Sequence, residues 1–265
     1  MMFLTTATSD AVSETVTEAI SGALESEGGL TLSEFMYKGW LGLLAENGQI
    51  PLVLWIAAIV FCALLGYFLG SLNFAVVISR LKFHDDIRKH GSGNAGATNM
   101  TRTYGKAAGV ATLLGDIMKA ILSVILARLL CGETIAYLTG MCCAFGHAFP
   151  CYYRFKGGKC VAVTAAIALV MEPFAFLTIF AIFALVVFVT KYVSLGSIAA
   201  AFFYPLILHK LIMNRGYGHL SILFVTVICL LVIWLHRENI KRLLDGKENK
   251  FSFGKSQKQK NSDEK

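Results

Sequence analysis

A polar segment between two apolar stretches carries the residue types that bind anions. It runs from His90 to Arg102 and consists mainly of glycine, asparagine, serine and threonine. Glycine lets the backbone approach a ligand closely, and successive exposed N–H groups form anion-binding nests. A helix that opens near Lys106 would add the positive end of its dipole. This composition favours a phosphate-binding segment over a plain surface linker.

A second polar segment follows Gly146-His147 and ends in Gly157-Gly158-Lys159. It resembles part of a phosphate loop, but the spacing GxxxxGK[ST] is missing, so the sequence does not support nucleotide hydrolysis. Lys159 stands between glycines and an apolar stretch and suits contact with a phosphate as a point charge. Arg154 and Lys156 are interpreted as anchors at lipid headgroups. His147 is either a hydrogen-bonded interface residue or a ligand contact.

Two further segments carry weaker signals. Ser194 and Ser197 lie three apart and share a helical face, although hydroxyls in membrane helices often bond only the backbone. The segment from 236 onward has the pattern of an amphipathic interfacial helix. His236 and Asn239 lie one turn apart on one face and are candidates for ligand contact. Lys241 and Arg242 are interpreted as basic membrane anchors.

The elements that must position these segments are membrane helices. Of the 265 residues, 56% are hydrophobic and only 15% are charged, and the mean hydropathy is +0.63, which excludes an ordinary soluble protein. A membrane span takes about 20 residues. Most apolar stretches have that length; they lie at about 52–79, 107–130, 134–150, 160–189, 195–213 and 219–235. Glu172-Pro173 in the fourth stretch indicates two short helices with a turn, with one kinked helix as the alternative.

The distribution of charge decides between these topologies. The net charge is +7, but residues 1–50 carry seven acids against Lys38, and the chain after His236 carries nine bases against five acids. This asymmetry fits a topology signal and not a nucleic-acid footprint. Seven spans with the N-terminus outside place the basic segments 80–106, 151–159 and 190–194 and the C-terminal tail inside, with Lys210 and Arg215 as exceptions. The sequence therefore predicts an all-α membrane protein with seven transmembrane helices and a cytoplasmic C-terminus.

This predicted topology divides the chain into three regions. Residues 1–50 are predicted to form an extracytoplasmic extension with a short amphipathic helix around 31–45, residues 51–245 the membrane domain, and residues 246–265 a polar basic tail. The seven cysteines form no CxxC pair, so neither a zinc site nor a disulfide framework is expected. Asp116 and Lys119, an i,i+3 pair near the inner end of the second span, are predicted to neutralise each other.

The four polar segments, in this order, resemble the PlsY family of bacterial acyl-phosphate:glycerol-3-phosphate acyltransferases. The resemblance covers residues from about 55 to 250. Departures from the family's usual pattern are Asn73, Cys151, Cys160 and Gly196, and none of them removes a charge or a hydroxyl. The residues that carry the resemblance are Gly91-Ser92-Gly93-Asn94, Gly96-Ala97-Thr98-Asn99 and Arg102; Gly146-His147, Pro150 and Phe155 to Lys159; Tyr192-Val193-Ser194-Leu195 and Ser197; and His236-Arg237, Asn239-Ile240 and Arg242-Leu243-Leu244.

The resemblance implies an enzyme of the bacterial inner membrane with its active site at the cytoplasmic face. Such enzymes transfer a fatty acyl group from acyl phosphate to the 1-hydroxyl of glycerol 3-phosphate, which gives lysophosphatidic acid and phosphate, without a cofactor, metal, nucleic acid or obligate protein partner. The implied catalytic residues are Ser92, Asn94 and Arg102. The implied substrate-binding residues are Gly93, Thr98, Asn99, His147, Gly157, Gly158, Lys159, Ser194, Ser197, His236 and Asn239.

Several alternatives stay open at the level of sequence. The acyl donor is acyl phosphate by resemblance only, with acyl-CoA as the alternative, and an acyl-serine intermediate lacks an adjacent base. A transporter of a phosphorylated small molecule is the runner-up function, although no internal repeat is found. The clustered glycine-rich loops speak against a structural membrane protein. A His-x4-Asp pair is absent, which excludes the charge-relay mechanism of other glycerolipid acyltransferases.

Overall fold

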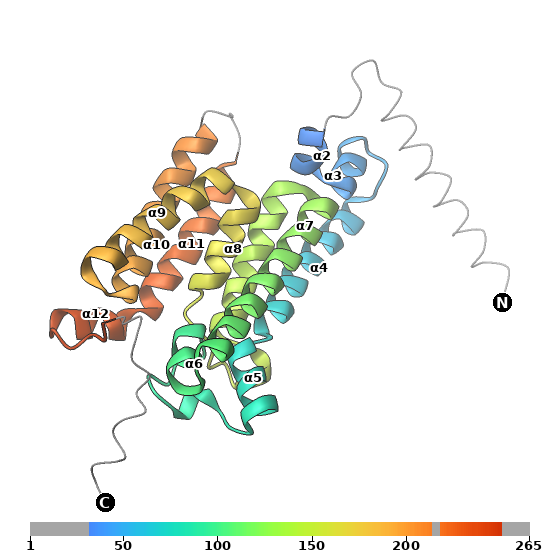
Figure 1. Ribbon diagram of the computed structural model, residues 1–265. Coiled ribbons are helices and arrows are strands. Elements are labelled where there is room, and N and C mark those ends of the chain that lie inside the picture. The colour runs from blue at the N-terminus through green and yellow to red at the C-terminus, as the bar shows by residue number, and fades with distance from the viewer. Residues whose placement is uncertain (1–31, 214–217, 251–265) are drawn as a thin grey trace, which may run out of the picture.

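The computed structural model describes residues 32–213 and 218–250, and within these ranges the chain forms helices and connecting loops without a strand. The long helices lie side by side in one bundle (Figure 1). Helices α2 (Leu32–Lys38) and α3 (Trp40–Glu46) lie at one end, and α5 (Phe74–Phe83), α6 (Ala97–Tyr104) and α12 (Arg237–Leu244) at the other. The predicted all-α class is confirmed.

The first apolar stretch is interrupted near its C-terminal end. Helix α4 spans Leu52–Ser71 and α5 begins at Phe74, so a short break divides the stretch that was predicted to be one span. Asn73 occupies the break. Its side-chain oxygen accepts a hydrogen bond from the Val76 amide at 3.1 Å and caps α5, and its amide nitrogen donates to the Ala95 carbonyl at 3.2 Å. The break therefore ties α4 to the first polar segment.

Helix α7 (Lys106–Ala148) is a hairpin of two antiparallel arms that meet at Gly132. This residue has φ 82° and ψ −174°, a backbone conformation that interrupts the helix and that glycine adopts readily. The arms run back along each other, because Lys119 of the first arm lies 2.9 Å from His147 of the second. The stretches 107–130 and 134–150 are thus separate helices, as predicted.

Glycines let α4 and the second arm of α7 pack backbone against backbone. A Cβ atom placed on Gly66 would lie 2.4 Å from the Thr139 carbonyl oxygen, and one on Gly70 would lie 2.1 Å from the Cys143 carbonyl oxygen. Gly146 approaches the Tyr67 carbonyl in the same way. Small residues at helix contacts are typical of membrane bundles, where close approach supplies the van der Waals attraction. The second polar segment therefore starts from a closely packed pair of helices.

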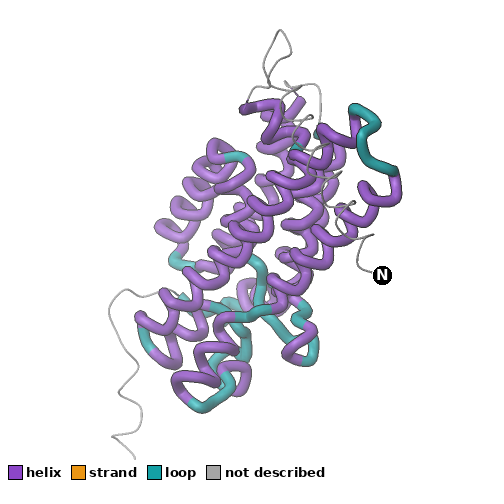
Figure 2. Tube along the Cα trace, turned by 90° about the vertical axis from the view of Figure 1, so that its right-hand side faces the viewer, coloured by secondary structure: helices purple, strands orange, loops and turns teal. Residues whose placement is uncertain are grey.

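The fourth apolar stretch divides where the sequence predicted. Helix α8 spans Val161–Met171, and Pro173 opens α9 (Pro173–Thr190) at its first position, where the missing proline N–H costs nothing. Helices α10 (Val193–Met213) and α11 (His219–Leu235) complete the bundle, and α12 leaves α11 at an angle of 51°. Figure 2 shows the loops gathered at the ends of these helices.

The predicted amphipathic helix at 31–45 is divided into α2 and α3 at Gly39, which has φ 70°. Gly39 rests directly on the turn of α7, since a Cβ atom on it would lie 2.2 Å from the Gly132 amide nitrogen. The hairpin of α7 and the end of the extension therefore fix each other. The remainder of the predicted extension and of the basic tail lies outside the described residues.

Long apolar helices are consistent with a multi-pass membrane protein. In the described part of the chain, four helices are long and apolar enough to cross a membrane, or five if the bent pair α11 and α12 is one span. This count takes α7 as a single helix and leaves out the short apolar α8. Both arms of α7 and α8 run through the buried core.

Candidate active site

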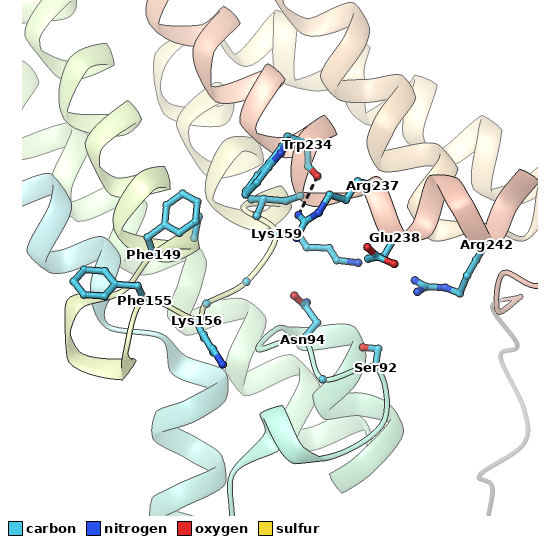
Figure 3. A pocket seen from close by; sticks show the side chains of 15 residues that line it. Ser92, Asn94, Phe149, Phe155, Lys156, Lys159, Trp234, Arg237, Glu238 and Arg242 are labelled. Atoms are coloured by element: carbon cyan, nitrogen blue, oxygen red, sulfur yellow. Dashed lines mark hydrogen bonds between the residues drawn. The ribbon is translucent and has the colours of Figure 1, made fainter.

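A pocket of about 310 Å³ lies at the end of the bundle where α6 and α12 are found. Figure 3 shows that its side chains come from three of the four polar segments. Six of the residues predicted for the site line it, namely Ser92, Gly93, Asn94, Gly157, Gly158 and Lys159. The chain thus brings together segments more than 140 positions apart.

The pocket has an apolar end and a cationic end. Phe149 and Phe155 lie at one end in Figure 3 and Arg242 at the other. The rings of Phe149 and Trp234 lie 6.0 Å apart, and the Arg237 guanidinium lies 4.4 Å from the centre of the Trp234 ring. Such a pocket suits a molecule that has both a hydrocarbon chain and a negative group.

Asn99 holds the first polar segment in shape. Its side-chain oxygen accepts a hydrogen bond from the Ser92 amide at 3.1 Å, and its nitrogen donates to the carbonyls of His90 and Asn94 at 2.9 and 3.1 Å. Gly91 has φ 57°, and a Cβ atom there would lie 2.2 Å from the Asn99 oxygen. Asn99 is 2% exposed, so the structure places it behind the loop rather than in the pocket.

The segment is also more helical than the sequence suggested. Thr98, Asn99 and Arg102 belong to α6 and not to a loop, with Gly96 as its N-cap. Thr98 and Arg102 are exposed and do not line the pocket. Local composition favours a loop here, whereas the fold adds a helix because α6 packs on α7.

A pair of charges braces the first segment against the second. Arg88 donates to the Asp86 carboxylate at 2.7 Å and to the Tyr153 carbonyl at 2.7 Å. The hydrogen bonds from Arg88 hold the pKa of Asp86 well below its ordinary value. The brace keeps the loop that carries Ser92 next to the loop that carries Lys159.

Lys159 is the central cation of the pocket. It donates a hydrogen bond to the side-chain oxygen of Asn239. Burial disfavours its charged form, and the nearby positive charges of Arg242 and then Arg102 act in the same direction, so that its pKa is lowered to about 8. Lys159 is therefore a cation that an incoming anion would stabilise.

Glu248 organises the residues around Lys159 and was not predicted. One of its carboxylate oxygens accepts hydrogen bonds from Ser194 at 2.8 Å and Asn239 at 2.7 Å, and the other accepts from Arg242 at 2.8 Å. Burial raises the pKa of Glu248, but the hydrogen bonds from Asn239 and Arg242 outweigh this effect and lower it. Glu248 lies in a polar tail, where sequence offers no signal for such a role.

Arg242 was interpreted as a basic membrane anchor, but the structure also gives it contacts within the site. Arg242 lines the pocket and pairs with Glu248. Its spacing of three residues from Asn239 places both on one helical face, which is the signal that points to it. Lys156, also interpreted as an anchor, lines the pocket as well.

Eight predicted residues lie outside the pocket lining. Besides Thr98, Asn99, Arg102 and Asn239, four of them bond mainly to the protein. Ser197 donates to the Val193 carbonyl at 2.9 Å, and the His236 ring bonds the Val232 carbonyl at 2.8 Å. Ser194 contacts Glu248, and His147 is buried behind Gly158. Direct contact of these four residues with a substrate stays a prediction.

Comparisons with known proteins show the family of the chain. The family model for glycerol-3-phosphate acyltransferase matches residues 60–246. A glycerol-3-phosphate acyltransferase of Syntrophotalea carbinolica is 43% identical over 191 residues, which cover 71% of this chain and 95% of the relative. One from Alkaliphilus metalliredigens is 40% identical over 184 residues, 69% of this chain and 91% of the relative.

Solved structures with the same fold are similar as well. The crystal structure of PlsY, an integral membrane glycerol 3-phosphate acyltransferase, in its glycerol 3-phosphate form is 36% identical, with a TM-score of 0.68 over 73% of this chain and 96% of that chain. The lysophosphatidic acid form gives 34% identity and a TM-score of 0.65 over 73% of this chain and 95% of that chain. The chain is an integral membrane acyltransferase that belongs to the glycerol-3-phosphate acyltransferase (PlsY) family.

Proposed function

We propose that this enzyme transfers a fatty acyl group from acyl phosphate to the 1-hydroxyl of glycerol 3-phosphate. The products are lysophosphatidic acid and phosphate. The observation that carries the proposal is the two-ended pocket, in which aromatic rings at Phe149 and Phe155 lie opposite Arg242, with Lys159 and the Ser92 loop between them. The apolar end suits the acyl chain, and the cationic end suits the two phosphates.

Positive charge would hold the anions. Lys159 and Arg242 lie in the pocket, and Arg102 is close enough to lower the pKa of Lys159. Backbone N–H groups of Gly157 and Gly158 are taken by the carbonyls of Ala148 and His147, so the loop contributes its shape and its lysine. Both substrates are anions, and their mutual repulsion makes such cations necessary.

The reaction itself needs positioning more than a strong base. The glycerol 1-hydroxyl oxygen forms a bond to the acyl carbon, the bond from that carbon to the phosphate oxygen breaks, and the hydroxyl proton leaves with the phosphate. Alignment of this kind supplies roughly 7–11 kcal/mol of the barrier. We assign to Ser92 the role of orienting the attack, and to Asn94 and Arg102 contact with the reacting groups. The reaction needs no cofactor, since an acyl phosphate is already activated.

The proposed topology has seven spans, with the extension 1–50 outside and the tail 246–265 in the cytoplasm. The spans are α4, the two arms of α7, and α8 to α11. The polar segments then meet at one end of the bundle, opposite α2 and α3, as Figure 1 illustrates. Their Lys and Arg residues support a cytoplasmic active site in the bacterial inner membrane.

Purified protein in lipid or detergent, given glycerol 3-phosphate with palmitoyl phosphate or palmitoyl-CoA, tests the reaction. We expect lysophosphatidic acid and phosphate from the acyl phosphate alone, and loss of product in R102A and K159A at glycerol 3-phosphate concentrations that suffice for the parent enzyme. Lys82→Ala is the matched control, because Lys82 is an exposed lysine at the same end of the bundle that stacks on Phe83.

Each other result has a definite meaning. Product from palmitoyl-CoA would support the acyltransferase activity and contradict acyl phosphate as the donor. Full activity in Ser92→Ala would remove Ser92 from the mechanism, whereas a trapped acyl-serine would replace direct attack by a two-step transfer. No product from either donor, with a folded protein, would favour transport of a phosphorylated small molecule.

A further inference from the structure

A buried charged cluster lies behind the pocket and does not line it. Asp116 and Lys119 come from the first arm of α7 and His147 from the second, and they are 2%, 4% and 4% exposed. Asp116 and Lys119 form the predicted ion pair at 2.9 Å. Mutual neutralisation alone does not explain why Asp116 and Lys119 are present, because a buried ion pair often stabilises a protein no more than apolar residues of similar size do.

Lys119 uses all three of its hydrogen-bond donors on other groups. Its ammonium donates to the carbonyls of Gly70 and Leu72 at 2.9 and 2.7 Å, at the end of α4, and contacts Nδ1 of His147 at 2.9 Å. An ammonium has no acceptor, so His147 Nδ1 accepts this bond and the ring proton sits on Nε2. This contact is shorter than the 3.6 Å between Nδ1 and Asp116. Lys119 therefore fixes both the place and the tautomer of His147.

The other side of the His147 ring faces the second polar segment. A Cβ atom on Gly158 would lie 2.2 Å from His147 Nε2 and 2.8 Å from the Ala95 carbonyl oxygen, so Gly158 is enclosed between the two. The Gly158 amide also donates to the His147 carbonyl at 3.0 Å. Ala95 in turn accepts a hydrogen bond from Asn73 at 3.2 Å. The first and second polar segments thus meet at Gly158.

We propose that Asp116, Lys119 and His147 are positioning residues for glycerol 3-phosphate. Lys119 anchors the His147 ring to the end of α4. The ring and the His147 carbonyl fix the position of Gly158, and this position determines where the next residue, Lys159, places its ammonium. Asp116 balances the charge of Lys119 in this buried place. The inference rests on the proposed function, in which Lys159 binds a substrate phosphate.

The test compares four variants in the assay with glycerol 3-phosphate and acyl phosphate. D116N removes one charge at constant shape, and K119M removes the anchor. H147N keeps an acceptor near Nδ1 but withdraws the ring from Gly158, whereas H147Q reaches towards Gly158 without the acceptor. We expect the KM for glycerol 3-phosphate to rise at least about tenfold, with kcat changed less than about threefold and the KM for acyl phosphate unchanged, because a displaced Lys159 ammonium weakens substrate binding without moving the reacting atoms.

Thr112→Ala is the matched control, since Thr112 is fully buried one turn earlier on the same arm and bonds only the Ala108 carbonyl. Melting temperatures in detergent are measured for all variants. If D116N and K119M do not fold, the two histidine variants carry the test. Lower melting temperatures with an unchanged KM would show a purely structural role and overturn the inference.

A second arm places D116N and H147Q in a K159A background. If the cluster acts through Lys159, these changes add less than about twofold to the KM of K159A. Full additivity would overturn the inference while the proposed function stands. An unchanged KM in K159A alone would overturn the phosphate site of the proposed function itself, and the two failures are therefore distinguishable.

Discussion

Lys159 shows how one residue of this site gains its chemistry from its surroundings. The glycines before it bring the backbone against His147, and its ammonium reaches Asn239 across the pocket. Burial and the charge of Arg242 weaken its hold on its proton. A bound phosphate reverses this effect, because an opposite charge favours the protonated form. Lys159 is therefore most useful to the enzyme at a pH below its own pKa.

The pH dependence follows from this sign. We expect kcat/KM for glycerol 3-phosphate to rise through about pH 6, where a phosphate monoester loses its second proton, and to fall as the pH rises through the pKa of Lys159 at about 8. K159R removes the alkaline fall, since a guanidinium keeps its proton there. Steady-state kinetics from pH 5 to about 10 checks this. Lys156→Arg is the control, and an unchanged alkaline limb in K159R would contradict the assignment.

Glu248 gives a second prediction at this scale. E248A removes the acceptor of three hydrogen bonds and leaves Arg242 without its carboxylate. Hydrogen bonds to charged groups contribute about 1.5–3 kcal/mol each, so we expect kcat/KM to fall about 10- to 100-fold. E248Q retains an acceptor oxygen and loses less. Asp245→Asn, exposed on the same segment, is expected to keep the activity of the parent enzyme, and equal losses in D245N and E248A would refute the role of Glu248.

At the scale of elements, sequence predicts what depends on composition and misses what depends on contact. Apolar length and Pro173 predict the arms of α7 and the division of α8 from α9. At the break, Asn73 makes a local N-cap bond to Val76 and a bond to Ala95, 22 positions along the chain, and no local pattern reveals the second bond. The helix α6 and the role of Glu248 are missed for the same reason, because partners distant in the chain stabilise them.

The turn of α7 is predicted to be intolerant of a side chain. A Cβ atom on Gly132 would lie 2.2 Å from the Tyr37 carbonyl oxygen, at a positive φ. We expect G132A to destabilise the protein by about 1–3 kcal/mol or more and to lower the melting temperature by several degrees. Gly42→Ala is the matched control. Its Cβ would lie 3.6 Å from Trp55, so alanine fits and gains about 0.5–1 kcal/mol of helix stability.

At the scale of the whole molecule, the polar segments converge on one end although the chain crosses the bundle between each pair of them. Because successive helices alternate in direction, every second connection lies at the same end of the bundle. Residues of these connections line the pocket. The opposite end carries α2 and α3, packed on the turn of α7. The pocket and the α2–α3 segment thus lie at opposite ends of the bundle.

Cysteine labelling tests the proposed orientation. Gln49→Cys and Lys89→Cys place exposed thiols at opposite ends of the bundle, and five of the seven native cysteines are buried. In intact cells, we expect a membrane-impermeant maleimide to label position 49 and to reach position 89 only after permeabilisation. The parent protein gives the background. The reverse pattern would invert the topology, since both positions keep their place in the fold.

The hairpin of α7 has a consequence for insertions and deletions. Lys119 and His147 stand at nearly equal separations from Gly132, and at a rise of 1.5 Å per residue the turn lies about 20 Å from them. One residue more or less in either arm would turn the following part by about 100° and separate the partners. The alignment of Lys119 with His147 therefore depends on the number of residues between each of them and Gly132 at the other end of the hairpin, and the length of each arm is as constrained as residue identity.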